Sequence, residues 1–118
     1  MESIVAVRAL GALAQDTRLA IFRLLVGAGP RGLAAGEIGT RLRVPGPTLS
    51  FHLSQLANAG LVVSARQSRS IVYSANFETM NGLLGFLTDD CCGGSPALCL
   101  PARQAKAIRP RRRRAVAA

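Results

Sequence analysis

Aromatic residues are scarce in this sequence: it has no tryptophan, and aromatic residues make up 4% of the chain, whereas hydrophobic residues make up 49%. A composition rich in leucine and alanine and poor in aromatic residues favours helices packed on helices. The sequence also lacks an apolar run of the roughly 20 residues that cross a bilayer. The apolar stretch at 10–14 does not indicate a signal peptide, because Glu2 replaces the usual basic start and Arg8 interrupts the apolar segment. We therefore expect a cytoplasmic protein without a membrane segment.

Acidic residues are missing from the end of the chain, where the positive charge is concentrated. The net charge is +9, but seven of the fifteen basic residues lie after Pro101 and no acidic residue does. Residues 1–90 hold eight basic and six acidic residues, so that part carries a net charge of only +2. We predict one folded domain over 1–90, a cysteine-containing segment over 91–100 and a disordered arginine-rich tail over 101–118. Such a tail can follow DNA phosphates and raise affinity without adding sequence preference.

The sequence lacks the motifs of common enzymes. Its glycine-rich stretch, with Gly27, Gly29 and Gly32, does not follow a predicted strand and so does not form a phosphate-binding loop. The single histidine, His52, has no serine or cysteine with an orienting carboxylate placed to partner it. We predict that the protein is not an enzyme and requires no cofactor.

Apolar spacing predicts helices on both sides of the central part of the chain. We expect a helix over 3–14 and a second one that runs to about Val26 with Asp16 or Thr17 as its cap. A polar, glycine-rich link over 31–34 should lead to a helix over 35–42, and the last helix should span 77–89 with Asn76 as its cap. In the second helix, Arg18 and Arg23 are predicted to lie outside, and the inward residues to be Leu19, Phe22, Leu25 and Val26. The terminal helices carry apolar stripes that nothing else in the domain obviously covers: Ile4, Val7, Leu10 and Leu13 in the first, and Met80, Leu83, Leu84 and Leu87 in the last.

The central helix follows two prolines and a glycine. Gly46 is suited to cap it and Pro47 to be its first residue, because proline loses no hydrogen bond there. The helix has an uncharged polar outer face, Gly60 in the left-handed position after its end, and an inward stripe made of Leu49, Leu53 and Leu56.

A predicted hairpin follows this helix. It has β-branched strands over 61–65 and 70–75, joined by a basic turn over 66–69. A short helix with a polar face, followed by a basic hairpin, is typical of a winged helix-turn-helix. In that fold the helix enters the DNA major groove and the hairpin touches the backbone beside it.

The order of residues is more specific than this architecture. The residues that carry the pattern are Thr48, Ser50, His52, Leu53, Leu56, Ala59, Gly60, Leu61 and Val62. They resemble the recognition-helix segment of the ArsR/SmtB family of bacterial repressors, which commonly has Ser-Thr-x-Ser-x-His-Leu and, a few residues later, Ala-Gly-Leu-Val. The resemblance extends from about Val7 to Phe86. It implies a mainly α fold with a β-hairpin wing, about five helices and two short strands, that binds double-stranded operator DNA.

We predict that four residues of the recognition helix contact base edges: Thr48, Ser50, Phe51 and Gln55. Phe51 is either a satellite core residue or a contact to thymine methyl groups. His52 is predicted to support this face, with a hydrogen bond at the edge of the packing or to a phosphate. Arg66 and Arg69 of the hairpin are predicted to contact phosphates.

The two apolar terminal helices indicate a homodimer. In ArsR-like proteins these helices form the dimer interface, and a two-fold protein matches a two-fold DNA site. The spacing alone also allows both helices to pack only on their own subunit.

All three cysteines follow the last predicted helix: Cys91, Cys92 and Cys99. Three clustered thiols in a cytosolic chain favour metal binding or redox chemistry over a structural disulfide. Adjacent Cα atoms are about 3.8 Å apart, whereas disulfides span about 4.4–6.8 Å. Cys99 is therefore the feasible disulfide partner for either member of the adjacent pair.

The number of ligands narrows the choice of metal. Structural zinc sites nearly always have four ligands, and here only Asp89 or Asp90 could complete the set. Three thiolates alone suit trivalent arsenic or antimony. The pattern also resembles one arsenic-responsive ArsR subgroup, which has a vicinal cysteine pair and a third cysteine just beyond the last helix. The best-known Cys-x-Cys site of the family is absent from the region 37–40, and its His/Asp zinc site in the last helix is absent too.

The sequence therefore predicts a dimeric repressor that releases operator DNA when trivalent arsenic or antimony, as inducer, binds Cys91, Cys92 and Cys99. One alternative is a thiol redox-sensing repressor with a Cys92–Cys99 or intersubunit disulfide. Another is a ligand-independent architectural DNA-binding protein that relies on its arginine tail, and in that case the three thiols are incidental.

Overall fold

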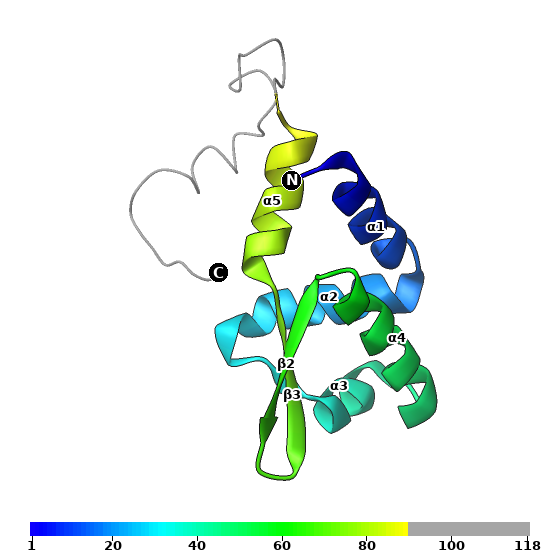
Figure 1. The fold of residues 1–118 in the computed structure, drawn as a ribbon. Helices are drawn as coiled ribbons and strands as arrows, with labels where there is room; N and C mark the ends of the chain where they lie inside the picture. The colour runs from blue at the N-terminus through cyan, green and yellow to red at the C-terminus, as the bar shows by residue number, and fades with distance from the viewer. Residues whose placement is uncertain (90–118) are drawn as a thin grey trace.

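A computed structural model describes residues 1–89, which form five α-helices, one short 3-10 helix and a three-stranded sheet (Figure 1). The elements in chain order are α1 (Ser3–Leu13), α2 (Asp16–Ala28), η1 (Gly29–Arg31), β1 (Leu33–Ala34), α3 (Ala35–Leu42), α4 (Gly46–Asn58), β2 (Val62–Gln67), β3 (Ser70–Ala75) and α5 (Phe77–Leu87). The predicted winged helix-turn-helix is confirmed: α3 packs on α4 across a short turn, and β2 and β3 form the hairpin wing. The predicted cysteine segment and arginine-rich tail lie outside the described residues.

Side-chain caps begin α2 and α5. The predicted cap of α5 is confirmed, because Asn76 Oδ1 accepts a hydrogen bond from the Thr79 amide at 3.2 Å. The predicted cap of α2, Asp16 or Thr17, is wrong: Gln15 Oε1 accepts a hydrogen bond from the Arg18 amide at 2.9 Å. Asp16 is instead the first helical residue, where its carboxylate lies at the positive end of the helix dipole.

The recognition helix α4 begins one residue earlier than expected. Gly46 is its first helical residue, and Pro45 precedes it with φ −61° and ψ 150°, so the predicted cap at Gly46 is wrong. Proline suits the position before a helix because its φ is fixed and no amide donor is needed there. After the helix, Gly60 has φ +79°, which confirms the predicted left-handed end.

A close approach at Gly39 sets the packing of α3 on α4. A Cβ at this position would lie 3.1 Å from the Val44 carbonyl oxygen and 3.3 Å from Leu49 Cδ2. The Val44 amide also donates to the Gly39 carbonyl oxygen at 3.0 Å. The absence of a side chain at Gly39 therefore lets the turn fold back on α3 and brings α4 close.

The sheet has one more strand than the predicted hairpin. Its order is β1-β3-β2, all antiparallel, and β1 lies within the predicted link over 31–34. Leu33 pairs with Tyr73, but two residues are too few for a recognisable alternation of apolar and polar side chains. β2 also extends further than predicted, so Arg66 lies in the strand and only Ser68 and Arg69 form the turn.

The core joins all five helices to the base of the wing. α1 contributes only alanines, Ala6, Ala9 and Ala12, whose small side chains let it lie close to α2 and α4. The predicted inward stripe of α4, Leu49, Leu53 and Leu56, is confirmed. In α2 the prediction for Leu19 is wrong, because Leu19 is 45% exposed whereas Ile21 is fully buried. Two residues along a helix correspond to about 200° of rotation, so these two side chains lie on nearly opposite sides.

The terminal helices α1 and α5 pack on each other (Figure 1), yet both leave large apolar side chains exposed. We call these exposed side chains the α1–α5 surface: Ile4, Val7 and Leu10 of α1, and Leu84, Phe86 and Leu87 of α5. Several exposed apolar residues on neighbouring helices are typical of a protein–protein interface. These helices do not resemble membrane spans, since no helix within residues 1–89 is long and apolar enough to cross a bilayer.

Candidate nucleic-acid interface

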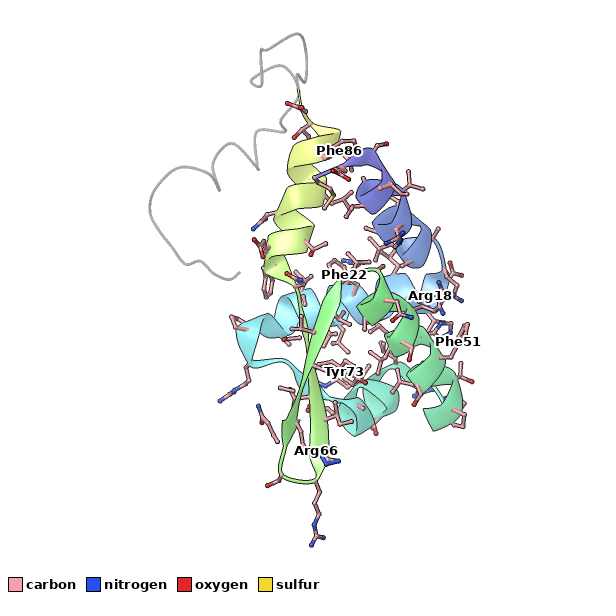
Figure 2. The ribbon with its side chains drawn as sticks, in the orientation of Figure 1. Arg18, Phe22, Phe51, Arg66, Tyr73 and Phe86 are labelled. Atoms are coloured by element: carbon pink, nitrogen blue, oxygen red, sulfur yellow. The ribbon has the colours of Figure 1, made fainter. Side chains whose placement is uncertain are left out.

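The outer face of α4 is uncharged and accessible. Its exposed residues include Thr48, Ser50, Phe51, Ser54 and Asn58. Hydroxyl and amide groups can hydrogen-bond to base edges, and an apolar ring can contact a thymine methyl group. Phe51 is 55% exposed and points away from the core (Figure 2). Three of the predicted base contacts, Thr48, Ser50 and Phe51, therefore lie where DNA could reach them.

The other two predicted residues of α4 lie differently. Gln55 is half-buried and lines a groove between α1 and α4, together with Arg8 and Asn58. His52 is only 8% exposed and does not belong to the outer face. It lies at the edge of the packing, which is one of the two locations predicted for it.

The wing carries two exposed cations. Arg66 lies in β2 across from Ile71, and Arg69 lies in the turn at the tip. Figure 2 shows Arg66 at the end of the hairpin that lies away from the helical body. No acidic residue occurs between Gly46 and Ala75. An uncharged helix face beside a cationic hairpin suits a ligand that presents base edges and phosphates together.

Two further arginines lie at the end of α3. Arg41 Nη2 is bound to Glu37 Oε2 at 2.7 Å in an exposed ion pair one helical turn apart, which contributes at most about 1 kcal/mol. Arg43 is exposed beside the turn that leads into α4, and it has the left-handed conformation, φ 57° and ψ 46°. Arg43 is thus better placed than Arg41 to meet a phosphate.

A cluster of three side chains connects α2 to α4. Arg18 Nε donates a hydrogen bond to His52 Nδ1 at 3.2 Å, and the bond is partly buried. The Arg18 Cζ atom also lies 5.8 Å from the centre of the Phe51 ring, within the range of a cation–π interaction. Figure 2 shows Arg18 and Phe51 close together. The predicted outward position of Arg18 is therefore wrong, and the apolar spacing within α2 gave no signal of a partner on another helix.

The predicted metal ligands Cys91, Cys92 and Cys99 lie outside the described residues. Within residues 1–89, no three His, Cys, Asp or Glu side chains gather in a way that could hold a metal ion. Because α5 ends at Leu87, the three cysteines follow this helix closely in the chain.

The fold and the accessible surfaces of α4 and the wing define a winged helix-turn-helix DNA-binding protein. Similarities to known proteins support this class. A family model described as a helix-turn-helix domain matches residues 13–65. An uncharacterized HTH-type transcriptional regulator from Bacillus subtilis, YceK, is 36% identical over 77 residues, which cover 64% of this chain and 76% of that protein.

Solved structures narrow the family. HlyU from Vibrio cholerae is 33% identical with a TM-score of 0.59, and the match covers 74% of this chain and 97% of that one. A structure of reduced HlyU from the same organism is 29% identical with a TM-score of 0.57, covering 76% and 92%. The homodimeric winged helix-turn-helix domain of a possible ArsR-family regulator from Mycobacterium bovis is 27% identical with a TM-score of 0.59, covering 73% and 80%. The chain belongs to the HTH-type transcriptional regulators, in their ArsR-like winged-helix group.

Proposed function

We propose that this regulator is a homodimeric repressor that binds operator DNA through α4 and the wing and releases it when trivalent arsenic or antimony binds Cys91, Cys92 and Cys99. The observation that carries the DNA-binding part is the pairing of an uncharged, exposed helix face with a cationic hairpin in one module. In this proposal four residues of α4 contact bases: Thr48, Ser50, Phe51 and the half-buried Gln55. Arg66 and Arg69 of the wing contact phosphates.

The α1–α5 surface supports the homodimer. In the single chain, Ile4 and Val7 are 63% and 64% exposed, and Leu84 and Leu87 are 54% and 55% exposed. A second copy would remove this apolar surface from water. It would also provide a second α4, as required by half-sites about 34–36 Å apart. The Mycobacterium bovis domain, which is homodimeric, has the same fold.

The choice of inducer rests on the residues after α5. Three thiols occur within residues 91–99, and no histidine lies near them in the sequence. A site limited to three thiolates suits a thiophilic, three-coordinate ion better than zinc, which nearly always takes four ligands in structural sites. A ligand that draws these cysteines together would act on the chain directly after α5, and so on a helix of the proposed dimer interface.

Titration with arsenite tests this proposal. The probe is a DNA duplex selected by the wild-type protein from a random library, with a scrambled duplex of the same composition as its control. Under reducing conditions, arsenite should weaken binding of the wild type to the selected duplex by about 5- to 150-fold. The variant with Cys91, Cys92 and Cys99 all replaced by serine should bind the duplex as tightly and ignore arsenite. Equal release of both proteins by arsenite would refute the three-cysteine site.

A thiol redox switch is the second candidate, and one comparison favours it. One solved structure of the similar protein HlyU from Vibrio cholerae is of its reduced form. Here, two thiols would give up two protons and two electrons to hydrogen peroxide, forming one disulfide and two water molecules, with Cys99 as one partner. Peroxide without arsenite should then release the DNA and a thiol reductant should restore binding. A Cys99→Ser variant should not respond to peroxide if the disulfide forms within one chain.

A further inference from the structure

Arg18 joins two helices through its side chain. It lies in the first turn of α2, and its Nε donates to His52 Nδ1 of α4 at 3.2 Å. Among residues 1–89, this is the one hydrogen bond between side chains of different helices. α2 is fixed in the core by Ile21 and Leu25, both fully buried. The guanidinium therefore extends from a well-anchored helix onto α4.

The hydrogen bond defines the form of the imidazole. An arginine side chain carries five N–H donors and has no acceptor. His52 Nδ1 must therefore be the acceptor, which places the imidazole proton on Nε2. His52 is the only histidine in the sequence, so its ring nitrogens can be observed without overlap.

The same guanidinium holds the neighbouring ring on the outer face of α4. Arg18 Cζ lies 5.8 Å from the centre of the Phe51 ring, and the His52 ring lies 5.7 Å from it at an angle of 61°. A phenylalanine that is 55% exposed on a helix would otherwise exchange rotamers rapidly. Contacts from Arg18 and His52 favour one orientation of the Phe51 ring before any DNA is bound.

We infer that Arg18 is a positioning residue for DNA recognition. It keeps the Phe51 ring in the orientation that meets the base edges by lying over this ring and by hydrogen-bonding to His52. Arg18 itself does not touch the bases. The inference rests on the proposed role of α4 as the recognition helix. It predicts that sequence selectivity depends on a residue of α2 that lies outside both the recognition helix and the wing.

The test compares two charge-conserving variants, Arg18→Lys and Arg8→Lys. Lysine keeps the positive charge but lacks the planar guanidinium, which hydrogen-bonds to His52 and lies over the Phe51 ring at the same time. Arg8 and Arg18 both line the groove between α1 and α4, so Arg8 serves as the matched control. Each protein is titrated with the duplex selected by the wild type and with the scrambled duplex, and its melting temperature is measured.

Arg18→Lys should lower the ratio of selected to scrambled affinity at least about fivefold, because a lysine ammonium cannot contact the Phe51 ring and hydrogen-bond to His52 at the same time. Scrambled-duplex affinity should stay within about twofold, because non-specific binding depends on charge. Arg8→Lys should change neither. If Arg18→Lys keeps full selectivity, or loses equal affinity for both duplexes, the inference is wrong.

A double-mutant cycle separates positioning from a general structural role. Once Phe51→Ala has removed the ring, adding Arg18→Lys should cause no further loss of selectivity, whereas an independent structural effect would add to it. Ser50→Ala reports on the proposed function itself. If Ser50→Ala loses selectivity and Arg18→Lys does not, only the role of Arg18 is refuted. If neither variant loses selectivity, the assignment of α4 as the recognition helix is refuted as well.

One measurement needs no variant. Nitrogen-15 NMR of His52 in the wild-type protein should show a proton on Nε2 and an unprotonated, hydrogen-bonded Nδ1. Binding the selected duplex should leave this pattern unchanged. A spectrum with the proton on Nδ1 would contradict the Arg18–His52 hydrogen bond and overturn the inference, even if the Arg18 variant fails to fold.

Discussion

Gly32 lies so close to Tyr73 that a Cβ on this glycine would overlap the Tyr73 carbonyl oxygen. The close approach joins the chain before β1 to β3, and the next residue, Leu33, pairs directly with Tyr73. Gly32 also has φ +74°, a conformation that other residues rarely adopt. The base of the wing is thus attached to the helical body at a position where only glycine fits.

Replacing Gly32 by alanine should therefore destabilise the protein. Both the steric overlap and the positive φ oppose a Cβ, and we expect a decrease of about 2–4 kcal/mol in the free energy of unfolding. Urea denaturation followed by circular dichroism measures this. Gly36→Ala is the matched control, because Gly36 lies in α3 with no atom within 4 Å of its Cβ position. That variant should be as stable as the wild type or slightly more stable; a similar decrease in both variants would contradict the packing argument.

The strand β1 could not be predicted from the sequence, unlike the α-helices and the hairpin. The helices, the hairpin and the inward stripe of α4 follow from local spacing, because each repeats an apolar pattern over several residues. Leu33 and Ala34 form a strand only because Tyr73 and Val72 lie opposite them. Arg18 likewise meets His52 through the packing of α2 on α4. Pairings between residues distant in sequence leave no periodic signal, so neither could be predicted.

Only part of the candidate site could likewise be predicted from the sequence. The exposure of Thr48, Ser50 and Phe51 agrees with the inward stripe, because each of them lies about 90° or more around the helix from the centre of the stripe that Leu49, Leu53 and Leu56 form. Gln55 lies at least as far from that stripe as Thr48 does, yet it is half-buried, because it faces α1 across a groove. Their binding to DNA stays a prediction.

A charged residue in the α1–α5 surface should separate the proposed dimer without unfolding the subunit. Leu84 is 54% exposed in the single chain, so Leu84→Glu costs the subunit little, whereas a dimer would bury two unpaired carboxylates. Sedimentation equilibrium should show a monomer with an unchanged helical circular dichroism spectrum. Val63→Glu, at a 49% exposed position on the wing, is the control and should remain dimeric. A dimeric Leu84→Glu protein would place the interface elsewhere.

Substitutions in α4 and in the wing should affect DNA binding differently. Ser50→Ala combined with Gln55→Ala should reduce discrimination between duplexes, by about 1–3 kcal/mol for each base-specific interaction that is removed. Arg66→Ala combined with Arg69→Ala should weaken binding to all duplexes alike. It should also flatten the plot of log affinity against log salt by about 0.9 for each phosphate that is no longer neutralised. Fluorescence anisotropy at several salt concentrations measures both effects, and a wing variant with altered sequence preference would contradict this division.

Deleting residues 102–118 removes seven cations and no anion. If these residues follow phosphates, the deletion should make the salt dependence shallower by about 0.9 for each phosphate that the tail had neutralised, while the preferred sequence stays the same. Replacing the seven cations by glutamine is the matched control, because it keeps the length of the chain and removes only the charge. The same salt slope in all three proteins would show that the tail does not bind the DNA.

Coupling between the cysteines and the operator must act in both directions. If a metalloid bound by Cys91, Cys92 and Cys99 weakens operator binding, thermodynamic linkage requires the operator to weaken metalloid binding by the same factor. A coupling of about 1–3 kcal/mol corresponds to about 5- to 150-fold. Isothermal titration of the reduced protein with arsenite, with and without the selected duplex, measures this factor independently of the release experiment. Monomeric Leu84→Glu protein should bind arsenite equally well with and without DNA, because the proposed coupling passes through the dimer interface. Stoichiometric arsenite binding that the duplex does not weaken in the wild type would rule out the cysteines as the switch.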